Sequence, residues 1–412
     1  MANCQRCGRE LPAFSWGAAS NLCPECRAAA AATTAPVPAM PSVSRARRRF
    51  PPLTTALVGI NLAVFAAMAL SGISLSEPTT SQLLAWGANW GPRSLGTQPW
   101  RMLVSNYVHI GFIHIAFNMW CLWDLGNLAE RIFDRTTYLL TYLASGMAGS
   151  LASLLWHPLV VGAGASGAIF GLAGALITAL YLGHLPIPKQ AVRHTLRSLV
   201  IFAGYNLFFG AVGEGIDNSA HLGGLFTGLA LGALMAKHLT TAGEARGRWR
   251  LGVFAATGVL LFASFGFIRR ANGYVVPLEQ GVNELVAKQN DAAIRDLEKA
   301  AAEKPNDAST LGLLGDAYVQ TGQYAKAENV LERALRIDPT VAEADVRYNL
   351  GFAKLKLGKI DEAIPLLQKA AQLDPKDPDT QEGLSEAYQA KNMQMEARAA
   401  MQRAQDLRKT GH

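Results

Sequence analysis

Six long apolar blocks without Asp, Glu, Lys or Arg are the feature that most restricts the fold of this chain. A helix needs about 20 apolar residues to cross the hydrocarbon core of a bilayer. The longest block holds two such helices, separated at His157-Pro158. The chain has 50% apolar and 17% charged residues, and this composition excludes an ordinary soluble enzyme. We therefore expect an all-α polytopic membrane protein with seven spans, in residues 53–76, 102–123, 136–188, 198–213, 218–236 and 251–268.

Basic residues predict the orientation of the spans, because cytoplasmic loops are enriched in Lys and Arg. Arg45 and Arg47–Arg49 precede the first span and place the N-terminus in the cytoplasm. Seven spans then leave the C-terminal part extracytoplasmic. Arg269-Arg270 conflict with this orientation, because they would place basic residues at the outer end of the seventh span. They leave open the alternative that 251–268 is a re-entrant helix, which would place the C-terminal part in the cytoplasm. The loops expected in the cytoplasm are all basic, with Arg131 and Arg135, then Lys189, Arg193 and Arg197, then Lys237, Arg246, Arg248 and Arg250.

The formal net charge of +7 follows from this topology and from contact with the anionic lipid bilayer, so no nucleic-acid partner is expected. The first fifty residues lack the apolar core of a signal peptide, and the first span is therefore expected to be an uncleaved anchor. These features predict a multi-pass membrane protein, and we expect its location to be the bacterial inner (plasma) membrane.

Composition divides the chain into four parts. A cysteine-bearing module at 1–28 is followed by a flexible linker with a basic juxtamembrane cluster at 29–52. The membrane domain covers 53–268, and a charged helical part covers 277–408.

The charged part repeats in steps of 34 to 36 residues, with the order L-G-x2-Y, A-x3-L-x2-A and a closing Pro. This pattern resembles the tetratricopeptide repeat. The resemblance implies an α-solenoid with a groove for a protein or peptide partner, and a passive cap or spacer is the alternative. The residues of one unit are Leu314, Gly315, Tyr318, Ala327, Leu331, Ala334 and Pro339, and those of the next are Leu350, Gly351, Ala363, Leu367, Ala370 and Pro375.

Four cysteines near the N-terminus have the spacing of a metal site. Cys4-x2-Cys7 and Cys23-x2-Cys26 are separated by fifteen residues, which suits a tetrahedral structural zinc in a zinc-ribbon-like module. The predicted cytoplasmic location disfavours the alternative of disulfides. A redox function of these cysteines and free, unligated thiols are further alternatives. Cys121, in the second span, is expected to be a packing residue.

Polar residues inside the spans indicate a catalytic site, since they are costly in a bilayer. Ser166 and His221 lie in the first turns of the fourth and sixth spans. Both spans start on the outer side, so both residues are expected about one turn, roughly 5 Å, from their helix starts. Glycines spaced i, i+4 would let the two backbones approach closely enough for a Ser–His hydrogen bond. They are Gly167 and Gly171 on one helix, and Gly224 and Gly228 on the other.

A serine nucleophile needs a base and hydrogen-bond donors for the developing oxyanion. His114 and Asn118, at i and i+4 on the second span, offer two side-chain donors on one helix face. Backbone N–H groups at the glycine-rich helix start, such as that of Ala165, offer others. No carboxylate lies inside the spans near the outer face. The prediction is therefore a Ser166–His221 dyad that needs no cofactor for catalysis.

Taken together, these motifs resemble the rhomboid intramembrane proteases. The motifs are G-A-S-G at 164–167, A-H-x2-G-x3-G at 220–228, H-x4-H-x3-N at 109–118, and Trp100-Arg101 with G-A-N-W-G-P at 87–92. The resemblance covers 53–240. It implies a bundle of six helices plus one, and a serine endopeptidase that cuts the transmembrane segments of membrane proteins near the outer face.

The same resemblance implies roles for individual residues. Ser166 would be the nucleophile and His221 the base, with His114 and Asn118 in the oxyanion hole. Structural roles would fall to Trp100, Arg101, His109, Glu130, Gly164, Gly167, Gly224 and Gly228.

Two positions depart from the family's pattern. The family's G-x3-E-x3-G is here Gly126, Glu130 and Asp134, so the second glycine is missing and local packing is in question. Phe170 stands where an aromatic residue, often Tyr, stacks on the catalytic His, so the ring is retained without the hydroxyl.

Three other functions fit parts of the sequence. A proteolytically inert relative that binds or escorts membrane proteins is the main alternative, and the intact Ser166 and His221 argue against it. A transporter would show paired charges within its spans, which are absent here. A repeat protein with a membrane anchor would not need seven spans that carry motifs.

Overall fold

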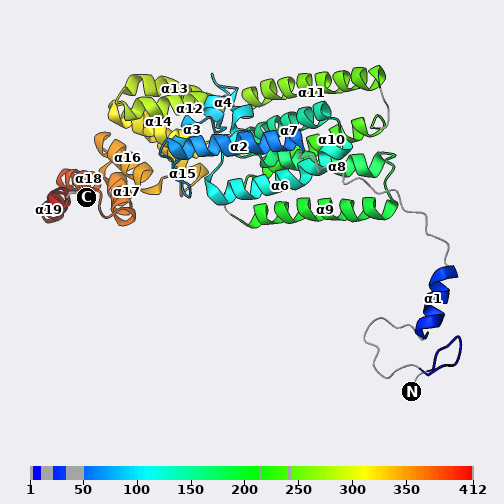
Figure 1. Cartoon of the computed structure of the whole chain (residues 1–412). Coiled ribbons are helices and arrows are strands. Elements are labelled where there is room, and N and C mark those ends of the chain that lie inside the picture. The colour runs from blue at the N-terminus through cyan, green and yellow to red at the C-terminus, as the bar shows by residue number, and fades with distance from the viewer. Residues whose placement is uncertain (1–2, 11–21, 34–50, 214, 240–242, 411–412) are drawn as a thin grey trace. The chain divides into compact units, whose positions relative to one another are not determined.

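The computed structural model describes residues 3–10, 22–33, 51–213, 215–239 and 243–410, and the regular structure in these ranges is helical apart from two isolated β-bridges. The chain divides into two units, Met1–Pro52 and Leu53–His412. The basic cluster Arg45 and Arg47–Arg49, with most of the predicted linker, lies outside the described residues. The predicted all-α fold is confirmed (Figure 1).

The N-terminal unit contains one helix, α1 (Pro24–Thr33), and a turn closed by an antiparallel bridge between Asn3 and Glu10. An ion pair of 2.6 Å joins Arg9 Nη1 to Glu25 Oε2, but both side chains are exposed, so it adds little stability. Cys4 and Cys23 are buried. The cysteines, rather than aliphatic side chains, form the described centre of this unit.

Seven helices of the larger unit overlap the predicted spans, but the second begins at Gly111 instead of Met102 and extends past Trp123 to Ile132, because residues 101–107 form separate short helices. The seven are α2 (Pro52–Leu70), α6 (Gly111–Ile132), α7 (Arg135–Trp156), α8 (Ser166–Leu182), α9 (Lys189–Val212), α10 (Asn218–Ala236) and α11 (Glu244–Ala271). The predicted separation at His157-Pro158 is confirmed, because α7 ends at Trp156 and α8 begins at Ser166.

Among the described residues, α2, α7, α9, α10 and α11 are long and apolar enough to cross a bilayer. Helix α8 is apolar but has only 17 residues, and α6 carries Asp124, Glu130 and Arg131 in its second half. The chain is a multi-pass membrane protein. That all seven helices cross the bilayer stays a prediction.

Helices α8 and α10 lie against each other within the bundle, and glycines allow their backbones to approach (Figure 1). A Cβ atom added at Gly224 would lie 1.9 Å from the carbonyl oxygen of Gly167. One added at Gly228 would lie 1.9 Å from the carbonyl oxygen of Gly171. Backbone atoms cannot move aside as a flexible side chain can, so any larger residue would force the two helices apart.

Between α2 and α6 the chain forms a folded outer loop of short helices. They are α3 (Thr80–Ala85), α4 (Gly91–Ser94), α5 (Arg101–Val104) and the 3-10 turn η1 (Ser105–Tyr107). Thr79 caps α3 in a capping box with Gln82, which fixes where this helix begins.

Eight helices follow α11 and pair into a solenoid. They are α12 (Val275–Val286), α13 (Asn290–Glu303), α14 (Ala308–Gln320), α15 (Tyr324–Ile337), α16 (Glu343–Lys356), α17 (Ile360–Leu373), α18 (Pro378–Ala390) and α19 (Gln394–Thr410). Small residues permit the pairing: a Cβ added at Gly315 would lie 2.3 Å from Leu331, and one at Gly351 would lie 2.8 Å from Leu367. The sequence pattern of the repeat therefore corresponds to close contacts between paired helices.

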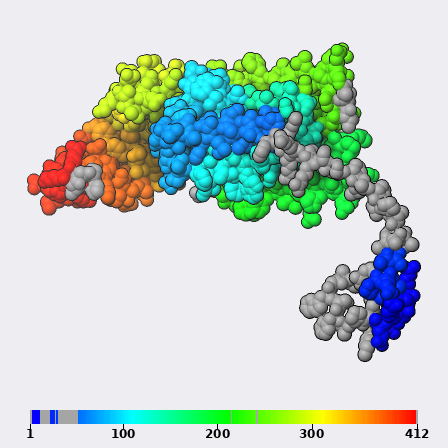
Figure 2. Space-filling model, viewed as in Figure 1, coloured from blue at the N-terminus to red at the C-terminus, as the bar shows by residue number. Residues whose placement is uncertain are grey.

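The first repeat packs directly on the outer loop and on the end of α7. Val275 and Leu278 of α12 share one hydrophobic cluster with Leu95 and Leu154, and Asn272 Nδ2 donates to the carbonyl of Leu154 at 3.1 Å. Figure 1 places α12 beside α4, and in Figure 2 the surface of the first repeats is continuous with that of the outer loop. The solenoid is thus attached to the end of the bundle that carries this loop.

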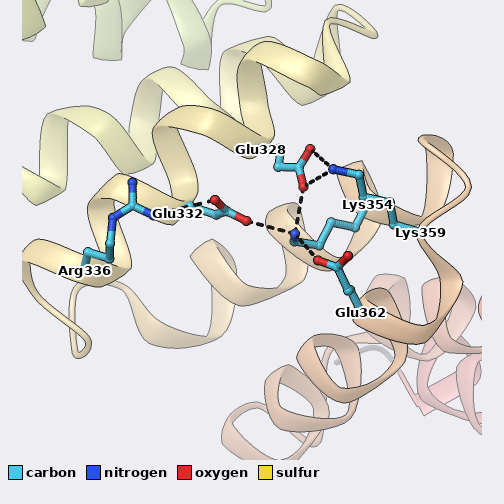
Figure 3. A network of polar contacts seen from close by, with 6 residues as sticks. All are labelled: Glu328, Glu332, Arg336, Lys354, Lys359 and Glu362. Carbon is cyan, nitrogen blue, oxygen red and sulfur yellow. Dashed lines mark hydrogen bonds and ion pairs between the residues drawn. The ribbon is translucent and has the colours of Figure 1, made fainter.

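A buried lysine connects three helices within the solenoid (Figure 3). Lys354 Nζ of α16 lies 2.7 Å from Glu328 and 2.8 Å from Glu332, both on α15, and 2.6 Å from Glu362 on α17. Burial opposes its charge, but the hydrogen bonds to these carboxylates raise the pKa of Lys354 above its ordinary value. The ammonium group therefore stays charged and balances three carboxylates that would otherwise repel one another.

Replacement of Lys354 by alanine should destabilise the solenoid by about 2 kcal/mol. The effect is smaller than the roughly 3–5 kcal/mol for a fully buried pair, because Glu362 remains in contact with solvent. Hydrogen exchange of α15 to α17 in the full chain measures this as faster opening. Lys391→Ala is the matched control, since its pair with Asp361 is exposed and contributes less than about 1 kcal/mol. Equal protection in both variants would contradict the prediction.

Candidate active site

A cavity of about 630 Å³ lies between α6, α7, α8, α9 and α10 and is lined by Ser166, His221, His114 and Asn118. These four residues come from three helices that are far apart in the sequence (Figure 1). The structure thus brings together the predicted nucleophile, base and side-chain oxyanion donors.

Ser166 is the first residue of α8, and the glycine two positions before it shapes this helix start. Gly164 has a φ of +124°, a conformation that L side chains rarely adopt. A Cβ atom at this position would also lie 2.6 Å from the ring of His114. The N–H of Gly164 donates to the carbonyl of Ser105 at 2.9 Å. Only glycine therefore fits between the outer loop and the His114 ring.

His221 lies in the first turn of α10 and is buried against an aromatic ring from α8. The rings of Phe170 and His221 stack with centroids 4.3 Å apart and an angle of 12° between their planes. Phe170 is one turn beyond Ser166, so the same helix carries the serine and the ring that orients the histidine. Within the described residues, His221 Nδ1 has no hydrogen-bond partner.

His114 and Asn118 lie one turn apart on α6. The N–H of Ile110 donates to His114 Nδ1 at 3.3 Å, so a neutral ring carries its proton on Nε2, which faces Gly164. Asn118 Nδ2 donates to the carbonyl of His114 at 2.9 Å. An amide NH₂ group has two hydrogens, so a second donor remains on Asn118.

His109 is fully buried between the 3-10 turn and the segment before Ser166. Its Nδ1 lies 3.3 Å from the carbonyl of Tyr107, and the N–H of Ala165 points to its Nε2 at 3.5 Å. These contacts fit the predicted structural role of His109. They also engage the Ala165 N–H, which the sequence suggested as an oxyanion donor, with the histidine ring.

Trp100 and Arg101 organise the outer loop. Arg101 is buried and donates from Nη1 to the carbonyls of Leu84 and Ala88, at 2.7 and 3.1 Å. Its guanidinium lies 4.9 Å from the centre of the Trp100 ring. Gly87, with a φ of +98°, passes so close to this ring that an added Cβ would lie 3.0 Å away.

Comparison with known proteins identifies the family. The Rhomboid domain model matches residues 96–238. "Rhomboid protease GluP" of Bacillus subtilis (strain 168) is 32% identical over 289 residues, which are 70% of this chain and 55% of that protein. "Rhomboid protease AarA" of Providencia stuartii is 30% identical over 199 residues, which are 43% of this chain and 69% of that protein. The chain belongs to the rhomboid family.

This rhomboid spans about half the length of the curated relatives it matches first. The tetratricopeptide repeat model matches residues 285–349, and a second such model matches 344–377, so the predicted repeats are confirmed. A solved structure titled "MamA MSR-1 C2" is 26% identical and covers 34% of this chain and 79% of that chain, with a TM-score of 0.30.

Glu130 and Asp134 explain how this rhomboid accommodates its departure from the family's glycine pattern. Glu130 Oε1 accepts hydrogen bonds from the N–H and the hydroxyl of Thr54, at 2.5 and 3.0 Å, and so holds the start of α2. Asp134, in place of the glycine, caps α7 through Thr137 and forms a 2.7 Å ion pair with Arg250 of α11. The position therefore gains contacts instead of losing them.

Sequence reasoning missed Asn89, which joins the outer loop to the segment that leads to Ser166. Asn89 and Gly162 exchange two backbone hydrogen bonds of 2.8 Å, and Asn89 Nδ2 donates to the carbonyl of Ser150 at 3.1 Å. The run at 87–92 identified this segment as part of a motif, but its pairing partner follows 73 residues later. It also missed Asp217, which lines the cavity just outside the uncharged block that begins at Asn218.

The four N-terminal cysteines, which precede the membrane domain in the sequence, lie close to one another. All four Sγ atoms lie within 4.8 Å of one another, and those of Cys7 and Cys23 are 3.6 Å apart. Backbone N–H groups of Cys23 and Arg6 lower the pKa of Cys4 to about 6. The N–H of Cys23 reaches Cys4 Sγ at 3.2 Å. The cluster has the donor atoms and spacing to bind a metal ion.

Proposed function

We propose that this rhomboid is an intramembrane serine endopeptidase that cleaves transmembrane segments of membrane proteins near the outer face. The observation that carries the proposal is the shared cavity of Ser166, His221, His114 and Asn118. Its relatives named rhomboid proteases support the same reaction class. The deciding experiment compares cleavage of a membrane-embedded substrate by the wild type and by Ser166→Ala.

In the proposed mechanism, His221 accepts the proton of the Ser166 hydroxyl as its oxygen attacks the scissile carbonyl carbon. The carbonyl oxygen becomes an oxyanion, which His114 Nε2–H and the second Asn118 N–H stabilise. His221 then donates its proton to the leaving amine. Water, activated by the same histidine, hydrolyses the ester between Ser166 and the substrate and restores the enzyme.

The stacking of Phe170 on His221 supports this assignment, because it limits the histidine ring to one plane. The alternative is an inert relative that only binds or escorts membrane proteins. That alternative predicts no covalent reaction at Ser166, and labelling with a fluorophosphonate probe distinguishes the two functions.

Asn118→Ala should lower kcat by about 10²-fold and leave KM nearly unchanged, because an oxyanion donor acts mainly in the transition state. Steady-state kinetics on a transmembrane substrate in proteoliposomes measure both constants. Asn127→Ala is a matched control on the same helix, since its Nδ2 likewise donates to a carbonyl one turn back, that of Trp123, and the residue is not among those that line the cavity. A rise in KM with unchanged kcat would assign Asn118 to substrate positioning instead.

We further propose that Cys4, Cys7, Cys23 and Cys26 bind a structural zinc ion. Tetrahedral coordination with Zn–S bonds of about 2.3 Å separates the sulfur atoms by roughly 3.8 Å, close to the 3.6 Å between Cys7 and Cys23. Four protein ligands leave no position for a substrate, so the ion would stabilise the module and take no part in proteolysis.

Purified protein should contain about one zinc per chain, and Cys4→Ser or Cys23→Ser should remove it. Metal analysis of protein prepared without chelators measures the content. Cys121→Ser is the matched control, since this cysteine lies in α6 and should leave the zinc content unchanged. Metal-free wild-type protein whose four thiols react freely would contradict the site.

We also propose that the protein resides in a bacterial inner membrane with its solenoid outside the cytoplasm. The solenoid would bind a protein or peptide partner there. Its groove of about 940 Å³ lies along α14, α16 and the start of α18. Tyr348 and Asn349 line it together with several aspartates. Such a groove is the usual ligand site of stacked helical repeats.

A further inference from the structure

Asp217 is the one carboxylate in the described lining of the catalytic cavity. The described lining contains no other Asp or Glu and no Lys or Arg, and its basic side chains are the two histidines His114 and His221. Asp217 stands immediately before α10, whose first turn carries His221. Nothing in the mechanism above uses it.

The side chain of Asp217 holds the first turn of α10 in place. Its Oδ1 accepts a hydrogen bond from the N–H of Ala220 at 3.1 Å and another from the hydroxyl of Ser219. The backbone carbonyl of Asp217 accepts the N–H of His221 at 3.3 Å. The bond from Ala220 satisfies a backbone donor that a helix start otherwise leaves free. Together the three bonds fix the backbone from which the His221 side chain projects.

The surroundings of His221 give the charge of Asp217 a second effect. His221 is buried, stacks on Phe170, and has no hydrogen-bond partner for Nδ1 within the described residues. When His221 accepts the proton of Ser166, a cation forms in this apolar place. A carboxylate one helical turn away, in the wall of the same cavity, lowers the energy of that cation through space.

We propose that Asp217 is a positioning residue for His221, capping the turn that carries the histidine and stabilising its cationic form with a negative charge. The inference rests on the proposed protease function. The proton passes from Ser166 to His221 and then to the leaving amine, and no step of this sequence transfers a proton to Asp217.

Three variants separate the two effects. Asp217→Asn keeps a good helix cap but removes the charge, so kcat should fall about tenfold with KM unchanged. Asp217→Ala removes both, so kcat should fall about 100-fold and the melting temperature should drop. Ser219→Ala, the matched control, removes one hydrogen bond and keeps the charge, and its kcat should stay within about threefold of the wild type.

Each variant is measured as full-length protein in proteoliposomes, by cleavage of a transmembrane substrate and by the rate at which a fluorophosphonate labels Ser166. Wild-type kcat in Asp217→Asn would overturn the charge effect. A higher KM with unchanged kcat would assign Asp217 to substrate binding and also overturn the proposal. Equal kcat and equal melting temperature for the Asn and Ala variants would overturn the capping effect.

The same measurements keep this inference distinct from the proposed function. A wild type that neither cleaves nor labels, like Ser166→Ala, refutes the protease and the role of Asp217 with it. If the wild type both cleaves the substrate and labels with the probe, and Asp217→Asn is equally active, only the role of Asp217 is refuted.

Discussion

Ser166→Ala should abolish cleavage of a transmembrane substrate, with a loss of at least about 10³-fold in kcat. Removing the nucleophile leaves only the oxyanion donors and substrate binding, and single losses of this kind in serine proteases cost several orders of magnitude. The substitution removes one hydroxyl at the start of α8 and leaves Gly164 and the Phe170–His221 stack in place. The measurement is the initial rate of product formation in proteoliposomes, with fluorophosphonate labelling as a second readout.

The control is Ser145→Ala on α7. Ser145 is also buried in the bundle, but it lies outside the cavity, and its hydroxyl has no hydrogen-bond partner within the described residues. This variant should cleave and label at nearly the wild-type rate. If Ser166→Ala retained even a tenth of wild-type cleavage, the assignment of the nucleophile would be wrong. Loss of activity in both variants would instead indicate damage to the fold.

Which segments form most of the helices, and the contact of α8 with α10, were predictable because they follow from local patterns. The absence of charge marks the spans, His157-Pro158 marks their separation, and glycines spaced one turn apart mark the α8–α10 contact. Each of these signals is contained within about one helix length of sequence. The prediction of family and fold therefore needed no contact between distant segments.

The remaining features depend on contacts between distant residues, which no local pattern encodes. The pairing of Asn89 with Gly162 fixes the segment before Ser166 from the outer loop. Asp217 was missed because polar residues were sought inside the uncharged blocks, whereas a helix cap lies one residue outside. The contact of α12 with α4 could not be predicted either, because apolar positions on a repeat do not identify their partner surface.

The contact between α12 and α4 also bears on where the solenoid lies. Helices α2 and α11 run in the same direction through the bundle, and the solenoid follows α11 at the end that carries the outer loop (Figure 1). Helix α11 is continuous over 28 residues, or about 42 Å, which exceeds the roughly 30 Å of a bilayer core. Arg269 and Arg270 occupy its last turn, where cations interact favourably with the helix dipole, so they need no cytoplasmic location.

We therefore expect the repeats outside the cytoplasm, beside the mouth of the active site, where they can recruit substrate ectodomains. A reporter active only outside the cytoplasm, fused after Asp406, should give a strong signal, and one active only in the cytosol should give nearly none. The same pair fused after Lys237, in the loop between α10 and α11, should give the reverse pattern and serves as the control. Cytosolic activity at both sites would show that α11 does not cross the membrane, and a solenoid on that side could meet only cytosolic partners.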